Sequence, residues 1–259
     1  MISLPTAYEL GSDKHPLISF DRSCKKCPLS CKEAVAGGGP DELTDVKLIV
    51  VSDHPGAYEI QVNHPFFDND GKRASKINKK TGRKTPEGFR NAGSMLRHTL
   101  KTMFGLDTYT DIWCTNIIKC DPKATKPQEA HAKACANAWF KKELATLDQF
   151  VPEVPILIAG TLAFKGIVAC FPELKRSLPN SLNDCRRTNH YRLGDHPLIF
   201  TFNPAPVARS EFRIETSVTL DSDDTYLVEA VRVIEPPIIG SPVWHFRKDL
   251  EPLRNFLDV

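Results

Sequence analysis

Two pairs of cysteines, far apart in the sequence, have the residue type and spacing to bind a metal. Cys24 and Cys27 form a C-x-x-C pair, while Cys120 and Cys135 flank a short acidic turn that contains proline. Four thiolates brought together suit a zinc ion or a [4Fe–4S] cluster, because both accept four cysteine ligands. A single C-x-x-C is a weak signal, but a second spaced pair beside an apolar strand strengthens it. The two pairs together predict a metal site.

The other cysteines have a simpler interpretation. Cys114, Cys170 and Cys185 lie in apolar surroundings, and we interpret them as small buried hydrophobic residues. Cys31 extends the first pair to C-x-x-C-x-x-x-C and could be a spare or substitute ligand. The first residues lack the basic and apolar regions of a signal peptide, so the eight cysteines favour metal ligation in a reducing, cytoplasmic setting over disulfides.

Composition and charge set broad limits on the class of protein. With 259 residues and 41% apolar content, the chain can bury a full core, and we expect 1–259 to form a single domain. No apolar run approaches about 18 residues, so no membrane-spanning segment is expected. The formal net charge is only +2. An anionic partner must therefore be met by a local basic patch.

Apolar runs that alternate with helix-like segments position the chemistry. The short apolar runs predict buried strands at 46–51, 111–118, 156–160 and 197–202. Apolar spacing predicts helices at 91–104, 128–150, 162–170 and 243–257. This alternation predicts an α/β fold, a three-layer α/β/α sandwich around a central four-stranded, mostly parallel sheet.

The ends of the predicted strands indicate where the functional site lies. Ligands of open α/β sheets bind at the carboxyl ends of the strands. Here those ends carry the polar segments 52–56 and 203–206 and the single residue Asn116. No glycine-rich loop that cradles phosphate is present, which argues against a dinucleotide-binding or P-loop enzyme.

Two segments do not belong to this alternation. The loop at 72–90 is the densest basic run of the chain, and it is either a solvated surface loop or a phosphate-contacting one. Its cations include Lys79, Lys80, Arg83 and Lys84. The segment 211–242 alternates β-branched and polar residues, which predicts an inserted β-hairpin.

A series of motifs follows one order along 24–209. They are Cys24-x-x-Cys27-Pro28-Leu29, Val51-Ser52-Asp53-His54-Pro55-Gly56, His64-Pro65-Phe66-Phe67, Asn91-Ala92-Gly93-Ser94-Met95-Leu96, Thr115-Asn116-Ile117-Ile118-Lys119-Cys120 with Cys135, Ile158-Ala159-Gly160-Thr161-Leu162-Ala163, and Thr201-Phe202-Asn203-Pro204-Ala205-Pro206-Val207-Ala208-Arg209. In this set and order the chain resembles the uracil-DNA glycosylase superfamily, and within it the iron–sulfur enzymes of family 4.

The resemblance implies a cofactor and a partner. Cys24, Cys27, Cys120 and Cys135 would hold a [4Fe–4S] cluster with a structural role, and zinc in the same ligands is the second candidate. DNA is the implied partner. Arg209 would lie on the rim that faces DNA, where it would join the basic loop. We expect a monomer, from a bacterium or encoded by a phage in a bacterial host.

The resemblance also assigns roles at the strand ends. Asn116 would read the Watson–Crick edge of a base flipped out of the DNA stack, since its amide offers both a donor and an acceptor. Phe66 would stack on the base, and Gly56 would line the base pocket. Asp53, where the family usually has Glu, would orient water or stabilise the cationic sugar. Asn203 stands where the family usually has His and would donate to the leaving base.

The implied activity is that of a monofunctional DNA glycosylase acting on uracil or a modified pyrimidine. The departures at Asp53 and Asn203 leave two alternatives beside it. One is a glycosylase for a hypermodified phage base, such as glucosylated hydroxymethylcytosine, in antiviral defence. The other is a catalytically silent member of the fold that binds DNA or a protein partner. From the residues alone, Phe66 could be a plain core aromatic and Asp53 a turn cap.

Overall fold

The computed structural model describes most of the chain outside its insertions. The described residues are 24–29, 34–56, 59–60, 63–66, 92–122, 125–188, 190–210, 239 and 242–257, together with short strands between 214 and 233. Cys31, the basic loop at 72–90 with Lys79, Lys80, Arg83 and Lys84, and the side chain of Arg209 lie outside what is described.

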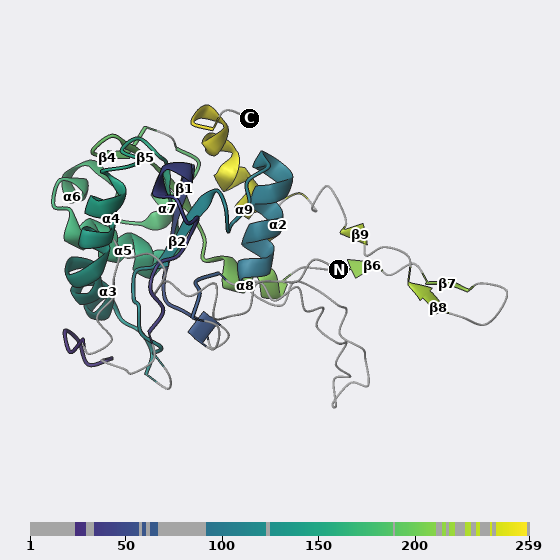
Figure 1. The fold of residues 1–259 in the computed structure, drawn as a ribbon, viewed down its shortest axis with the longest axis horizontal. Helices are drawn as coiled ribbons and strands as arrows, with labels where there is room; N and C mark the ends of the chain where they lie inside the picture. The colour runs from purple at the N-terminus through teal and green to yellow at the C-terminus, as the bar shows by residue number, and fades with distance from the viewer. Residues whose placement is uncertain are drawn as a thin grey trace.

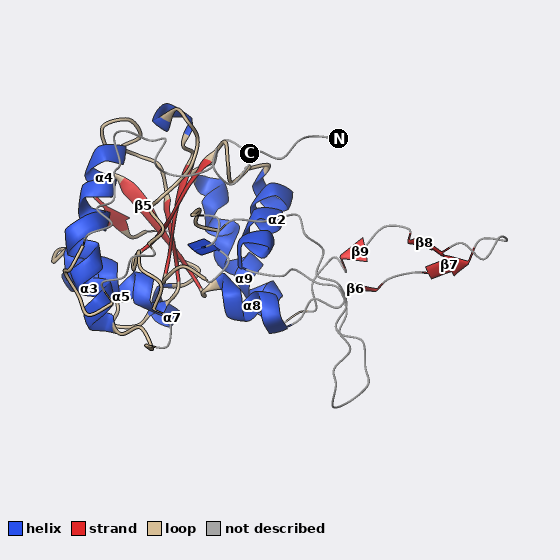
Figure 2. Cartoon of the chain, turned by 60° about the horizontal axis from the view of Figure 1, so that its bottom comes forward, coloured by secondary structure: helices blue, strands red, loops and turns tan. Residues whose placement is uncertain are grey.

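A mostly parallel sheet forms the centre of the molecule (Figure 2). In the described residues its strand order is β2-β1-β3-β5-β4. The strands are β1 Leu48–Ser52, β2 Ile112–Asn116, β3 Ile156–Ala159, β4 Arg192–Leu193 and β5 His196–Thr201. β2, β1, β3 and β5 pair in parallel, and every residue in these strands is buried. The α/β prediction and its parallel strands are thereby confirmed.

The prediction of a four-stranded sheet is wrong by one edge strand. β4 pairs antiparallel with β5, and it has only two residues, one of them exposed. Such a short, half-polar segment carries no periodic signal. The predicted helix 128–150 is also interrupted: α3 Glu129–Cys135 and α4 Lys141–Leu147 are joined by a π-helical turn at Ala136–Phe140. Insertions of this kind inside helices are frequent at functional sites.

Helices cover both faces of the sheet (Figure 1). One face packs against α3 and α5 Thr161–Cys170, and we call it the α3/α5 face. The other packs against α2 Ala92–Phe104 and α9 Pro242–Leu250, and we call it the α2/α9 face. Further short helices are η2 Leu43–Asp45, α6 Leu174–Ser177, α7 Leu182–Cys185, α8 Pro204–Ser210 and η4 Glu251–Asn255. The sheet therefore lies between two layers of helices.

Strand periodicity distributes the residues between the two faces. On β1, Ile49 and Val51 belong to the core of the α3/α5 face, while Leu48 and Val50 belong to that of the α2/α9 face. Side chains alternate along a strand, so Ser52, which follows Val50 by two positions, is directed to the α2/α9 face. The same parity applies to Asn116 on β2, because Ser52 and Asn116 are register partners.

The segment 34–40 runs antiparallel beside β2 and the residues that follow it, and brings the N-terminal part of the chain to this edge of the sheet. Ala34 bridges to Cys120 and Gly38 to Cys114, both antiparallel. Beneath it lies a buried ion pair, Lys119 Nζ to Glu143 at 2.5 Å. Glu143 also accepts from Trp113 Nε1 at 2.9 Å. A buried pair is retained only where hydrogen bonds satisfy it, as they do here, and it fixes α4 against β2.

Within the insertion at 211–242, the described residues form two antiparallel strand pairs. β6 Ile214–Glu215 pairs with β9 Arg232–Val233, and β7 Val218–Leu220 pairs with β8 Tyr226–Val228. In Figure 1 both pairs lie beyond α8, on the side of the molecule away from α5. Among the described residues no helix is both long and apolar enough to cross a membrane.

Candidate active site

The carboxyl ends of the four parallel strands lie side by side. The register pairs Ser52 with both Asn116 and Ala159, and Ala159 with Thr201. The backbone continues this alignment beyond the strands, since Ile118 N–H donates to the Asp53 carbonyl at 3.1 Å. The polar segments that the sequence places after separate strands therefore share one edge of the sheet.

Asp53 and Asn203, 150 positions apart, are joined by a hydrogen bond. Asn203 Nδ2 donates to Asp53 Oδ2 at 2.9 Å. The second carboxylate oxygen, Oδ1, accepts from the Ala163 N–H at 2.8 Å, in the first turn of α5. A helix N-terminus favours a negative charge because its first N–H groups have no partner within the helix. The Asp53 carboxylate is thus held by one donor at each of its oxygens.

Gly160 makes room for this carboxylate. Its φ is +128°, a backbone conformation that side-chain-bearing residues rarely adopt, and it lies at the start of α5. A Cβ at this position would collide with Asp53 Oδ1. The absence of a side chain lets the Asp53 carboxylate lie directly over the end of β3 and reach the α5 donor.

The Asn203 amide is oriented by both of its atoms. Its Oδ1 accepts from the Ala205 N–H at 2.8 Å, at the start of α8. Since an N–H can only donate, this contact fixes which amide atom is oxygen. The Nδ2 group has two hydrogens, and the bond to Asp53 uses one of them. Because the Asn203 side chain is held by these two contacts, its second Nδ2 hydrogen also has a fixed direction.

Asn116 is buried at the end of β2 with its donor unused. It is only 1% exposed, and its Nδ2 has no hydrogen-bond partner among the residues that the structure describes. A buried amide without a partner costs about 1–3 kcal/mol, so such a group in a natural structure calls for an explanation, and a catalytic or binding role is one. The α2/α9 face, to which Asn116 is directed, also holds Phe66 in its core.

Glu59 connects the two loop residues predicted to line the base pocket, and it was not among the residues predicted from the sequence. The Gly56 N–H donates to Glu59 Oε2 at 2.5 Å, and the Phe66 N–H donates to Oε1. Phe66 and Asn63 both have φ of +53°, and such strained residues cluster at functional sites. Phe66 is 3% exposed. No pattern in the sequence around Glu59 indicates this role.

Burial raises the pKa of Glu59 from its ordinary 4.5 to about 7, although the two N–H donors oppose the shift. A carboxyl with a raised folded-state pKa binds more protons in the folded than in the unfolded state between about pH 4.5 and 7. Its contribution to the free energy of unfolding is therefore present below about pH 4.5 and is lost as the pH rises through about 7. We expect Glu59→Gln to remove this part of the pH dependence in denaturant unfolding, while Glu251→Gln, an exposed control, leaves it unchanged. An identical pH dependence in wild type and Glu59→Gln would contradict this.

The four predicted metal-ligating cysteines come from segments that the fold brings together. Lys119 N–H donates to Cys135 Sγ at 3.3 Å, and Trp139 Nε1 donates to Cys24 Sγ at 3.3 Å. Burial raises the pKa of Cys135 to about 11, and the charges of Cys27 and Cys24 contribute in the same direction. Among the described residues, no group of three or more His, Cys, Asp and Glu side chains is placed to hold a metal ion. Cys114, Cys170 and Cys185 are buried, as predicted.

Comparisons with known proteins place this arrangement in a family. The family model described as "Uracil DNA glycosylase superfamily" matches residues 40–233, which include the strands of the sheet and the edge with Asp53, Asn116 and Asn203. Cys24 and Cys27 lie before the matched residues. A comparison with curated proteins found no match.

Proposed function

The chain belongs to the uracil DNA glycosylase superfamily, and we propose that it is a monofunctional DNA glycosylase. In this proposal it flips a uracil or a modified pyrimidine out of DNA and hydrolyses the N-glycosidic bond, which leaves an abasic site. Glycosylases must extrude the target nucleotide because its reacting atoms are inaccessible within the duplex.

The observation that carries the proposal is the unused donor of Asn116. A buried amide at the carboxyl edge of the sheet, whose Nδ2 has no partner in the described ranges, is suited to a ligand that brings its own acceptor. A pyrimidine carbonyl is such an acceptor, and the bond would strengthen as negative charge develops on the departing base. Phe66, on the same face of the sheet, supplies the apolar wall that a flat ring requires.

The paired Asp53 and Asn203 suit the two charges that separate in the reaction. Positive charge develops on the sugar as the glycosidic bond breaks, and a carboxylate held by two fixed donors can stabilise it without reorganising. The second Nδ2 hydrogen of Asn203 can donate to a carbonyl of the leaving base. The hydrogen bond between Asp53 and Asn203 holds the negative carboxylate and the donating amide at a fixed separation.

The proposal is tested with oligonucleotides that each contain one candidate base. Strands with uracil, thymine, hydroxymethylcytosine or its glucosylated form are incubated with the protein and then treated with alkali, which breaks the strand at abasic sites. We expect alkali-dependent breaks with at least one of the bases and none before alkali. Strands that stay intact with every base would contradict the proposed activity, and would leave a DNA-binding member of the family.

We further propose that Cys24, Cys27, Cys120 and Cys135 hold a [4Fe–4S] cluster. Four thiolates match the ligation of such a cluster, and N–H groups already donate to two of the sulfurs, those of Cys24 and Cys135. In a cluster each thiolate binds a different iron, whereas zinc requires four sulfurs around one ion. A bound cluster would supply no step of the reaction here. It would tie 24–29 to α3 and to the end of β2.

The cluster gives a direct prediction. The purified protein should be brown and contain four irons per chain, while Cys120→Ala and Cys135→Ala should lose visible absorbance and iron and unfold at a lower temperature. Cys185→Ala is the matched control, since Cys185 is buried elsewhere, and it should keep its iron. Iron analysis and the visible spectrum measure this. A colourless, folded protein with bound zinc would contradict the cluster.

A further inference from the structure

A pocket beside α9 combines cationic and aromatic side chains and has no role in the site described above. Its volume is about 350 Å³, and it is lined by Arg187, Trp244, Lys248, Glu251, Pro252 and Asn255. These residues come from the loop after α7, from α9 and from η4. A volume of this size is at the lower end of those that hold small ligands.

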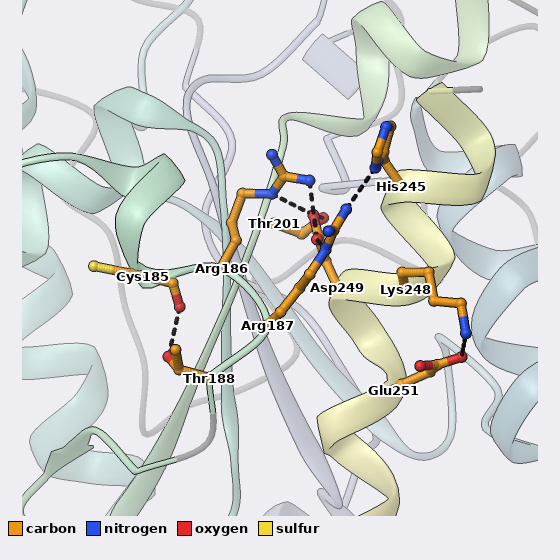
Figure 3. A network of polar contacts seen from close by, with 9 residues as sticks. All are labelled: Cys185, Arg186, Arg187, Thr188, Thr201, His245, Lys248, Asp249 and Glu251. Atoms are coloured by element: carbon orange, nitrogen blue, oxygen red, sulfur yellow. Dashed lines mark hydrogen bonds and ion pairs between the residues drawn. The ribbon is translucent and has the colours of Figure 1, made fainter. Parts of the chain in front are cut away.

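A buried carboxylate organises the wall of this pocket (Figure 3). Asp249 on α9 is 0% exposed and binds Arg186 in a bidentate manner, at 2.6 and 3.0 Å. It also accepts from Arg187 Nε at 3.3 Å and from Thr201 Oγ1 at 3.1 Å. The single negative charge of Asp249 is thus shared by two guanidinium groups. One positive charge is therefore left to attract an anionic ligand.

The outward cation is Arg187. Its side chain is 46% exposed, against 12% for Arg186. Its backbone has φ of +64°, rare for a residue with a side chain. Nη2 donates to His245 Nδ1 at 2.5 Å, which fixes the guanidinium at the pocket mouth. A strained backbone of this kind persists only where the surrounding structure holds it in place, and it is frequent at ligand sites.

Two cations lie near the ring of Trp244. The guanidinium carbon of Arg187 is 5.7 Å from its ring centroid, and Lys248 Nζ is 5.8 Å from it. Lys248 pairs with Glu251 at 2.7 Å, with both side chains more than 40% exposed. Exposed pairs of this type contribute only about 0–1 kcal/mol, so Lys248 can exchange Glu251 for another anion. The pocket therefore combines one aromatic ring with two positive groups close to it.

The wall of this pocket is continuous with the edge that carries the active site. The Arg186 guanidinium carbon stands 3.4 Å from the ring centroid of Phe202, the residue before Asn203. Thr201, which binds Asp249, is the last residue of β5. The residues that hold Arg187 in the wall of the α9 pocket are thus linked, through Thr201 and Phe202, to the segment that carries Asn203.

We propose that the α9 pocket binds a nucleotide of the DNA strand outside the base pocket, with a phosphate between Arg187 and Lys248 and an unpaired base on Trp244. This inference rests on the proposed function in taking DNA as the partner. Arginine and lysine at a groove with an aromatic face are the features by which proteins bind single strands. The cations Arg186, Arg187 and Lys248 face the carboxylates of Asp249 and Glu251, which leaves a positive charge for the phosphate.

The phosphate interaction is tested by the salt dependence of binding. The probe is a single-stranded oligonucleotide with no uracil or modified base, so that binding is read without excision. The variant Arg187→Ala/Lys248→Ala should flatten the slope of log K against log salt by about 0.7 for each phosphate that the protein no longer neutralises. Lys175→Ala/Arg176→Ala removes the same charge from α6, on the α3/α5 side of the sheet, and should leave the slope unchanged. Equal slopes in the two variants would overturn the proposal.

The stacking interaction is tested by substitutions at Trp244. Trp244→Ala should weaken binding to the same single strand roughly 5- to 150-fold, the cost of removing the ring on which one base stacks, and Trp244→Phe should restore most of it. A Trp244→Ala protein that binds as tightly as wild type would overturn the assignment of the base. The probe contains no excisable base, so its binding can be measured even if the protein excises nothing. Failure of the proposed function and failure of this inference can therefore be told apart.

Discussion

Asn116→Ala should lower the single-turnover rate of excision by about 10²–10³-fold or more, which is the cost of losing one donor to developing negative charge. Affinity for undamaged DNA should change little, because phosphate contacts supply most of it and base contacts supply specificity. Stability should also change little. The Nδ2 atom that is removed is buried and makes no hydrogen bond to any described residue, so its loss relieves a desolvation cost.

A matched control separates this effect from the general removal of a buried polar atom. Thr108 is 2% exposed, and within the described part of the chain its Oγ1 also lacks a partner, but it lies between α2 and β2 instead of at a strand end. Thr108→Val should keep the rate of excision and the stability. Quenched-flow measurement of abasic sites, with the variant proteins in excess over DNA, gives the rates. Normal excision by Asn116→Ala would show that the base pocket is elsewhere.

Substitution of Asp53 should give the second large loss of activity. Two substitutions separate the contribution of its charge from its structural contribution. Asp53→Asn removes the negative charge and should lower the rate of the chemical step by about 10²–10⁴-fold, with DNA affinity nearly unchanged. Asp53→Ala also removes the acceptor for the Ala163 N–H. It should lose the same activity and, in addition, about 0.5–2 kcal/mol of stability, as expected when an N-terminal cap is removed.

Gly160→Ala is an independent test of the same carboxylate. It keeps the charge of Asp53 but places a Cβ against its Oδ1, so the carboxylate must move away from α5. We expect a lower rate of excision in this variant, measured under single-turnover conditions. If Asp53→Asn turned over as fast as wild type, Asp53 would be a structural cap of α5 and nothing more.

The strands, and the edge of the sheet that carries the site, could be predicted from the sequence because they depend on local patterns. Runs such as Ile156–Ala159 are short, apolar and bounded by turn residues, and parallel strands must align their ends. Asn116 was found for this reason. The contact between Asp53 and Asn203 could be expected only as proximity, since its donor and acceptor atoms depend on how α5 and α8 begin.

Other features depend on contacts that no local pattern encodes. Glu59 acts by folding back on Gly56 and Phe66, and nothing in its immediate sequence marks a carboxylate that accepts two backbone donors. The α9 pocket joins Arg187 to His245, 58 positions later. The π-helical turn at Ala136–Phe140 interrupts a sequence with continuous helical spacing, because the packing of α3 and α4 prevails over local preference.

Mass spectrometry of the products of one reaction tests the central claim most directly. An oligonucleotide that carries the accepted base is incubated with the protein in water enriched in heavy oxygen. Hydrolysis of the N-glycosidic bond predicts free base and abasic strand in equal amounts, with the heavy oxygen on the sugar and an unbroken backbone. Free base that appears together with a broken strand before any alkali, or no free base from any of the candidate strands, would contradict the account.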